Sequence, residues 1–164
     1  MFSTDSILET INMIRLNKLD IRTVTLSLSL RDCMSEDIKV VGDKIYKKIS
    51  DYAKNLYSYA SEIEEEYSIP IVNKRIAITP ISIVGESCKN RDYVYLAKIL
   101  DQVADEVKVD FIGGYSALVE KGCTVGDIDL IESIPEALSQ TKKICSSVNL
   151  ASSKAGINMN AVLK

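Results

Sequence analysis

The 164-residue sequence contains no histidine, and this absence excludes more chemistry than any residue that is present. Without imidazole, these residues cannot supply Ser-His-Asp or Cys-His nucleophile activation, HExxH zinc chemistry, or a histidine acid or base. No other complete catalytic motif is present, so the catalytic residues and any cofactor stay unknown. The sequence therefore predicts architecture more fully than activity.

Cysteine is scarce and widely spaced. Cys33, Cys88, Cys123 and Cys145 form no CxxC pair and show no metal-ligand spacing. In a chain without secretion signals, we expect buried, reduced thiols and no metal site. A catalytic role for Cys145 would require a basic or helix-N-terminal neighbourhood, which its flanking residues do not show.

Clustered positive charge and long apolar runs are also missing. The net charge is −3 with a pI near 5.1, and the 20 Lys and Arg residues are scattered, which argues against a nucleic-acid surface. No apolar run approaches the roughly 20 residues needed to cross a bilayer, and the N-terminus has no signal-peptide pattern. With 46% hydrophobic residues, the chain is expected to fold as a cytoplasmic protein with neither membrane nor nucleic-acid partners.

Helical and strand periods alternate along the first half of the chain. A capping-box pattern from Ser6 to Glu9 predicts a first helix to about Asn17, and period-two alternation predicts a strand over Asp20–Leu30. Ser35 is expected to cap a helix of about 30 residues that crosses the sheet, although its stripe could also be a coiled-coil seam. The stripe consists of Ile38, Val41, Ile45, Ile49, Tyr52, Leu56, Tyr59, Ile63 and Tyr67.

The second half continues the alternation. The segment 81–88 is too short and apolar to assign by period, and the apolar spacing over Asp92–Lys108 predicts a helix. The Gly113-Gly114 pair is expected to break the third strand and to be followed by a short helix over residues 115–121. The remaining predictions are strands at Lys74–Thr79, Val109–Ile112 and Lys143–Leu150, and helical segments at Thr124–Glu132 and from Ser133 and Pro135 to about Thr141.

This order predicts an α/β fold with about four parallel strands joined by right-handed crossover helices, in a single unit over residues 1–164. Four parallel strands are few, and the pattern offers no antiparallel edge strand or hairpin to close the sheet. We therefore expect these four strands to form one part of a larger sheet.

Polar residues and glycines follow the apolar strands, where ligands gather in parallel α/β folds. Gly113, Gly114 and Ser116 could form an anion nest or an ordinary tight turn, and the segment 149–156 could hold an anion or satisfy its own backbone. Asp32 beside Arg31 could be functional, a surface ion pair or a helix cap. The candidate ligand-binding residues are Asp32, Thr79, Gly113, Gly114, Ser116, Ser146, Ser147, Asn149, Ser153 and Lys154.

Several long stretches together resemble one family of uncharacterised prokaryotic proteins. They are MFSTDSILETINMI, LDIRTVTLSLSLRDC, IPIVNKRIAITPI, VDFIGGYSALVEKG and IPEALSQTKKICSSVNLASSKAGINMNAV. The chain resembles domain-of-unknown-function family 711, also called uncharacterised protein family 0210 or "PFL family". Ser27 is a local departure, because the family is associated with glycine there.

The resemblance implies a ten-stranded α/β barrel like that of pyruvate formate-lyase, built from two parallel half-barrels around a cavity, with this chain as the N-terminal half-barrel. It does not establish an activity. Glycyl-radical enzymes of similar fold use cysteine thiyl chemistry, but no adjacent cysteine pair occurs here, which argues against radical catalysis. Because family members are often encoded beside a small ACT-domain protein, the resemblance also implies a possible partner. We expect the complete protein to bind a small anionic metabolite. Alternatively, it is a regulatory protein that docks a partner or a second copy. In either case, we expect the present segment to be inactive alone.

Overall fold

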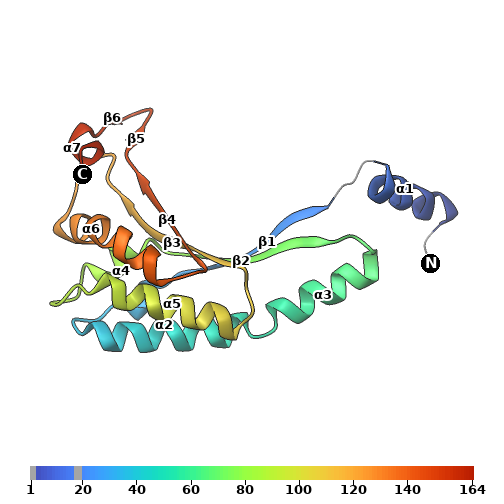
Figure 1. The fold of residues 1–164 in the computed structure, drawn as a ribbon, viewed down its shortest axis with the longest axis horizontal. Helices are drawn as coiled ribbons and strands as arrows, with labels where there is room; N and C mark the ends of the chain where they lie inside the picture. Colours follow the sequence, from blue (N-terminus) through green and yellow to red (C-terminus); the bar gives the residue numbers. More distant parts are fainter. Residues whose placement is uncertain (1–2, 17–19) are drawn as a thin grey trace.

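The computed structural model describes residues 3–16 and 20–164, and its centre is a four-stranded parallel sheet (Figure 1). The strands lie side by side in chain order, and each pairs in parallel with the next. This arrangement confirms the predicted α/β class with crossover helices. The strands are β1 (Ile21–Leu28), β2 (Ile71–Ile78), β3 (Phe111–Leu118) and β4 (Ile144–Asn149).

The helices that follow the first three strands lie together on one side of the sheet (Figure 1). Crossovers of one hand between sequentially ordered parallel strands place their connecting helices on the same face, so within residues 3–16 and 20–164 no crossover helix covers the opposite face of the sheet. The layer consists of α2 (Ile38–Ala53), α4 (Ile81–Gly85), α5 (Tyr93–Glu106) and α6 (Val125–Gln140), with a short 3₁₀ helix η1 (Arg31–Cys33) after β1.

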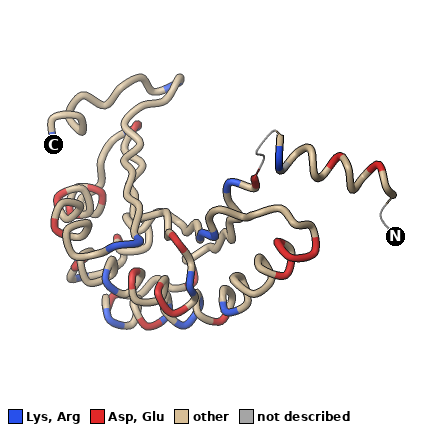
Figure 2. Tube along the Cα trace, turned by 45° about the vertical axis from the view of Figure 1, so that its right-hand side comes forward, with Lys and Arg blue, Asp and Glu red and all other residues tan. Residues whose placement is uncertain are grey.

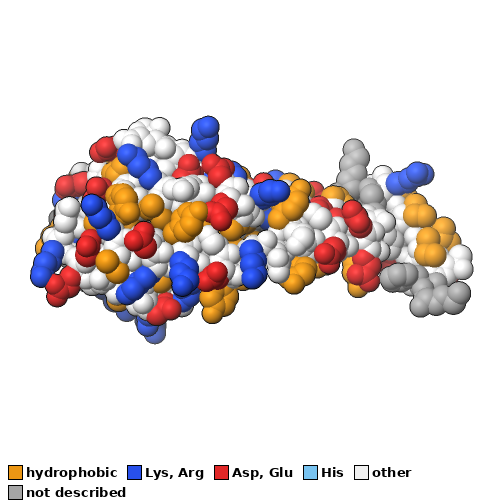
Figure 3. Space-filling view, turned by 90° about the horizontal axis from the view of Figure 1, so that it is seen from below, with side chains coloured by type: hydrophobic (Ala, Val, Ile, Leu, Met, Phe, Trp, Pro, Cys, Tyr) orange, Lys and Arg blue, Asp and Glu red, His pale blue; other side chains and the backbone are white. Residues whose placement is uncertain are grey.

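The hydrophobic core lies between the sheet and this helical layer. Alternate residues of the strands meet apolar stripes of α2 and α5, where branched side chains repeat at helical spacing. Fully buried members include Ile45, Ile49, Ile76, Leu96, Leu100 and Ile112. From below, where the helices face the viewer, Figure 3 shows Lys and Arg mixed with Asp and Glu over this layer, as expected for its solvated side.

The first halves of β1 and β2 extend beyond the other strands. β1 pairs with β2 from Ile21 to Leu28, whereas β2 pairs with β3 only from Arg75 to Ala77. This extension carries α3 (Leu56–Tyr67) and α1 (Thr4–Arg15), at the right of Figure 1. Glu64 of α3 accepts hydrogen bonds from the Ile71 amide (2.6 Å) and from Lys74 Nζ (3.1 Å), and these donors lower the pKa of its carboxyl group.

Helix boundaries differ from expectation in the first half of the chain. Ser3, not Ser6, caps α1, because the Ser3 hydroxyl accepts from the Ser6 amide at 3.1 Å; the expected end at Asn17 lies outside the described residues. Asp37, not Ser35, caps α2. The expected single long helix is wrong, since a turn at Lys54 and Asn55 separates α2 from α3.

The predicted strand break at the glycine pair and the helix over residues 115–121 are also wrong. β3 runs through both glycines to Leu118, and Gly114 (φ 126°) is the extra residue of a β-bulge. A bulge inserts one residue without ending the ladder, so glycine here marks an irregularity within the strand.

Other segments, before and after β3, also differ from expectation. The two expected helical segments are one helix, α6, which continues through Pro135, and residues Ile81–Gly85 of the unassigned segment form α4. Beyond β4, Ala151–Ser152 (β5) and Gly156–Ile157 (β6) form a small antiparallel pair before α7 (Met159–Val162), which was not predicted. This pair is separate from the main sheet.

Candidate functional site

Side chains on the face of the sheet away from the helices form the candidate site, which we call the open face. The opposite positions of each strand face the helices: Tyr115, for example, hydrogen-bonds Ser133 of α6, and Ile144 is buried. Because side chains alternate along a strand, the strand register defines the open face. From the Thr25–Arg75 pair to the carboxyl ends of the strands, it comprises Thr25, Ser27, Arg75, Ala77, Phe111, Gly113, Ser116, Leu118, Cys145, Ser147 and Asn149.

One row of small residues crosses all four strands of the open face. Ser27 pairs with Ala77, Ala77 with Gly113, and Gly113 with Cys145. A Cβ atom at Gly113 would have no neighbour within 4 Å, so the space above Gly113 is open. Two further pairs, Ser116 with Ser147 and Leu118 with Asn149, continue towards the ends of β3 and β4.

Arg75 is the only charged residue among these open-face positions. Its side chain is exposed, and Nε donates a hydrogen bond to Thr25 Oγ1 at 2.8 Å. Within the described residues 3–16 and 20–164, the two Nη groups have no hydrogen-bond or ion-pair partner. Figure 2 shows that β3 and β4 are free of charge and that most charged residues lie on helices and connections. Arg22 of β1 and Lys74 of β2 are charged, but they lie at alternate positions that face away from the open face.

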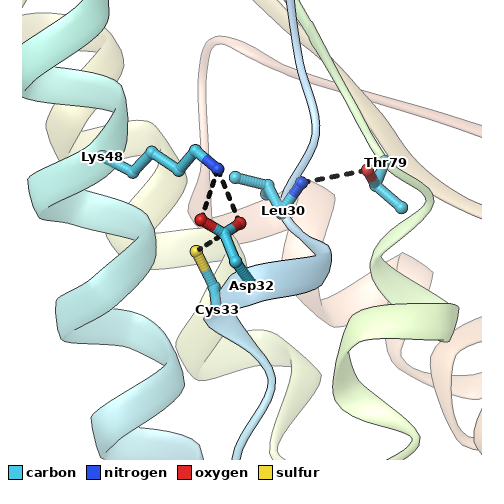
Figure 4. Close-up of polar contacts among 5 residues, drawn as sticks. All are labelled: Leu30, Asp32, Cys33, Lys48 and Thr79. Carbon is cyan, nitrogen blue, oxygen red and sulfur yellow. Dashed lines mark hydrogen bonds and ion pairs between the residues drawn. The ribbon is translucent and has the colours of Figure 1, made fainter.

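The predicted residues at the ends of β1 and β2 are engaged in structural contacts (Figure 4). Thr79 Oγ1 accepts from the Leu30 amide at 3.0 Å, and the Thr79 amide donates to the Leu28 carbonyl at 3.3 Å. Asp32 Oδ1 and Oδ2 accept from Lys48 Nζ at 2.5 and 2.7 Å. Thr79 therefore ties the two strand ends together, and Asp32 joins η1 to α2.

The Asp32–Lys48 pair borders a shallow hollow of about 330 Å³ beside α2. The hydrogen bond from Lys48 lowers the pKa of the Asp32 carboxyl group, and the same bond raises the pKa of Lys48. Cys33 is buried beside it, and this burial raises the pKa of the Cys33 thiol, so the thiol stays protonated. The hollow is lined by Asp32, Cys33, Lys44, Lys47, Lys48, Asp51 and Tyr52.

The glycine pair and Ser116 lie within β3 rather than in a loop before a helix. Gly113 faces open space, whereas a Cβ atom at Gly114 would lie 2.6 Å from the Ile78 carbonyl oxygen. The Ser116 hydroxyl donates to the Gly114 carbonyl at 3.3 Å and is mostly buried. Gly113 thus contributes space to the open face, and Gly114 allows β2 and β3 to approach each other.

The predicted residues of β4 divide between the two faces. Ser147 and Asn149 are exposed on the open face, and the Asn149 amide donates to Glu120 Oε2 at 3.4 Å. Ser146 faces the helices, where its buried Oγ has no hydrogen-bond partner among the described residues. Cys145, expected to be buried, is exposed on the open face.

Ser153 and Lys154 lie apart from these residues, in the turn between β5 and β6. The Ser152 hydroxyl accepts from the Ala155 amide at 3.1 Å, so this segment satisfies part of its own backbone. Gly156 has φ 77°, a conformation that favours glycine and closes the turn.

The fold brings together Gly113, Ser116, Ser147 and Asn149, and it leaves Asp32, Thr79, Ser146, Ser153 and Lys154 outside the open face. Sequence reasoning missed Arg75, Thr25 and Ser27. The alternation in the strands around Arg75 and Thr25 could have placed each on the polar side of its strand, but their pairing depends on register between residues 50 positions apart.

No group of three or more His, Cys, Asp or Glu side chains within residues 3–16 and 20–164 has the arrangement of a metal site. None of the helices in these ranges is long and apolar enough to span a bilayer. The polar groups on the open face are hydroxyls, an amide, a thiol and a guanidinium.

Comparison with known proteins identifies a family. The chain is 56% identical to a UPF0210 protein of Methanosarcina mazei over 162 residues, which are 99% of this chain and 36% of that protein. It is 60% identical to one of Acetivibrio thermocellus over 156 residues (95% and 34%), and 54% identical to one of Clostridium perfringens over 162 residues (99% and 36%).

The chain thus spans about a third of the length of these curated relatives. A family model described as Uncharacterised ACR (DUF711) matches residues 12–164. With nearly the whole chain matched by the model and by relatives at this identity, the protein belongs to the DUF711 family.

Proposed function

We propose that the complete protein is cytoplasmic and binds a small anionic metabolite on the open face, towards the carboxyl ends of the parallel strands. The observation that carries this proposal is the row Ser27, Ala77, Gly113 and Cys145, small residues that lie one alternate position beyond Arg75, with open space above Gly113. Ligands of parallel α/β folds bind at this end of the strands.

The composition of the open face supports a ligand-binding surface rather than part of a hydrophobic core or an ordinary solvated surface. A core-forming face would carry Val, Ile and Leu, and a solvated face would carry Lys and Glu. From the Thr25–Arg75 pair onwards, the open face carries hydroxyls, an amide, a thiol and a single Arg, with Phe111 and Leu118 the only large apolar side chains at these positions. Ligand pockets combine space with a few such polar groups.

We also propose that residues 1–164 form a half-barrel and that further chain, as in the longer relatives, covers the open face. Sequential strand order with helices on one side supports this, because barrels are wound in this way whereas doubly wound sheets carry helices on both faces. The open face would then line an internal cavity. The present segment alone would be inactive.

A thermal-shift screen of the full-length protein against carboxylates, phosphorylated metabolites and amino acids tests the proposal. We expect at least one anion to raise the melting temperature, and Gly113→Val to abolish that shift without lowering the melting temperature of the free protein, because its side chain would enter empty space. Absence of stabilisation by every compound, or an unchanged shift in Gly113→Val, would refute binding at this face.

A second candidate function is docking of a partner, either the small ACT-domain protein implied by the family resemblance or a second copy. Exposed residues of the apolar stripe along α2 and α3 favour docking: Tyr52 is 66% exposed, Tyr59 57% and Ile63 43%. Exposed aromatic residues are typical of interface centres. Size-exclusion chromatography with light scattering, and pull-down with the ACT-domain protein, test this docking function. A monomer that does not bind the ACT-domain protein would rule it out.

A further inference from the structure

We infer that Arg75 is the anchor of the open face and that it binds the carboxylate of a small monoanionic ligand. The inference rests on the proposed function and deepens it by naming the ligand class and the residue that recognises it. It follows from the geometry of the guanidinium and from the charge of its surroundings.

The hydrogen bond to Thr25 fixes which edge of the guanidinium is available. Arg75 Nε donates to Thr25 Oγ1 at 2.8 Å, so this edge is already used by the neighbouring strand. The remaining edge consists of the two Nη groups, which have no partner in the described part of the chain. Two parallel N–H donors on a planar group match the two oxygens of a carboxylate.

The charge of the open face selects a monoanion. Arg75 is the only charged residue there, so a carboxylate would be neutralised whereas a phosphate dianion would keep excess negative charge. The lysines beside α2 do not alter this, because their hollow is formed with η1 and α2 on the helical side.

Space for the ligand lies one row beyond Arg75, towards the carboxyl ends of the strands. The next open-face residues there are Ser27 on β1 and Ala77 on β2, followed by Gly113 on β3. Their small side chains leave room for the body of the ligand, and the Ser27 hydroxyl can bond a further polar group. A carboxylate with a second hydrogen-bonding group, such as a 2-hydroxy or 2-oxo acid, fits this arrangement.

Isothermal titration calorimetry on the full-length protein tests the inference with acetate, lactate, pyruvate and inorganic phosphate at matched ionic strength. We expect a 2-hydroxy or 2-oxo acid to bind more tightly than acetate or phosphate. Arg75→Gln should weaken that binding at least about tenfold, since it removes a charge-assisted bidentate pair. Arg75→Lys, which keeps the charge but loses the fork, should restore only part of the affinity.

Arg22→Gln is the matched control, because Arg22 is also an exposed strand arginine but lies at an alternate position of β1 that faces away from the open face. The Arg22→Gln variant should bind the 2-hydroxy or 2-oxo acid as tightly as the unchanged protein does. Carboxylate binding that survives in Arg75→Gln, full recovery in Arg75→Lys, or tighter binding of phosphate would overturn the inference while leaving an anion site on the open face intact. If no anion of any class binds, the proposed function itself fails.

Discussion

Gly114 and Ile78 approach so closely that a Cβ atom at Gly114 would lie 2.6 Å from the carbonyl oxygen of Ile78. The backbone of Gly114 also has φ 126°, which side-chain-bearing residues rarely adopt. This contact joins β2 to β3 beyond Ala77 and Gly113, where their ladder ends. Gly113 and Gly114 are neighbours in the sequence but have different roles: Gly113 faces open space, and Gly114 allows β2 and β3 to approach each other.

We expect Gly114→Ala to lower the free energy of unfolding by about 2–4 kcal/mol, because it adds both backbone strain and a clash with Ile78. Gly113→Ala is the control, since its Cβ atom would meet nothing within 4 Å and its φ needs no glycine. It should change stability by no more than about 0.5–1 kcal/mol. Urea unfolding followed by circular dichroism measures both; equal stability of the two variants would contradict this assignment.

Tyr115 predicts a pH effect on stability. It is fully buried, and burial raises the pKa of its phenol to about 12, against about 10 in an unfolded chain. The folded state therefore holds the proton more tightly. The stability that this provides is complete below pH 10 and is lost as the pH rises towards 12.

We expect the free energy of unfolding to fall more steeply between pH 10 and 12 in the unchanged protein than in Tyr115→Phe. The variant loses the 2.7 Å hydrogen bond to Ser133, but Ser133 keeps its bond to the Leu130 carbonyl, so the loss at pH 8 should be only about 1 kcal/mol. Urea unfolding across this pH range gives the two slopes. Parallel curves would show that Tyr115 does not titrate in this way.

The sequence predicts most of the fold because local periods agree with the tertiary arrangement. Period-two alternation places β1 within two residues of its observed bounds, the predicted fourth strand matches β4 within one residue at each end, and the 3.6-residue stripe with Asp92 gives α5. β3 was predicted over Val109–Ile112, but its continuation to Leu118 was missed for a physical reason. A glycine pair normally marks a turn, but here the close approach of Gly114 and Ile78 keeps the pair inside a strand.

The candidate site was less predictable, because the pairing register between strands decides which side chains share the open face. Ser147 and Asn149 follow from alternation in β4, whereas Ser146, beside them in sequence, faces the helices. Arg75 belongs to the open face through its cross-strand partner Thr25, and no local pattern reveals that pairing. Thr79 and Asp32 have the residue types of a site but are engaged in joining strand ends and η1.

The Asp32–Lys48 pair gives a prediction that a pKa measurement can test. The hydrogen bond from Lys48 lowers the pKa of Asp32, so the stability from this pair is present at neutral pH and is lost as the pH falls through that lowered value. We expect Lys48→Gln to return the pKa of Asp32 towards its usual range, while overall stability changes little because the Asp32 carboxylate is exposed.

A carbon-13 NMR titration of the Asp32 carboxyl group measures this pKa. Lys47→Gln is the matched control, because Lys47 lines the same hollow but makes no ion pair among the described residues. The Asp32 titration should be nearly unchanged in that variant. If Lys47→Gln moved the pKa as far as Lys48→Gln, general charge in the hollow rather than the hydrogen bond would be the cause.

Asp101 of α5 holds the start of β4, and its removal should destabilise the sheet at that edge. Oδ1 accepts from the amides of Lys142 (3.0 Å) and Lys143 (2.8 Å), and the Lys143 carbonyl in turn accepts from the Ile112 amide of β3 (2.8 Å). Asp101→Ala leaves two amides without their acceptor and should lower the free energy of unfolding by about 1–3 kcal/mol.

Asp101→Asn separates the acceptor role from the charge, because an amide oxygen can still accept both bonds. It should retain more than half of the stability that Asp101→Ala loses. Asp43→Ala, at an exposed position of α2 without a side-chain hydrogen bond in the described chain, is the control and should stay within about 0.5 kcal/mol of the unchanged protein. Hydrogen exchange at Lys142 and Lys143 should accelerate in Asp101→Ala alone; unchanged exchange there would mean that β4 is anchored to β3 without help from α5.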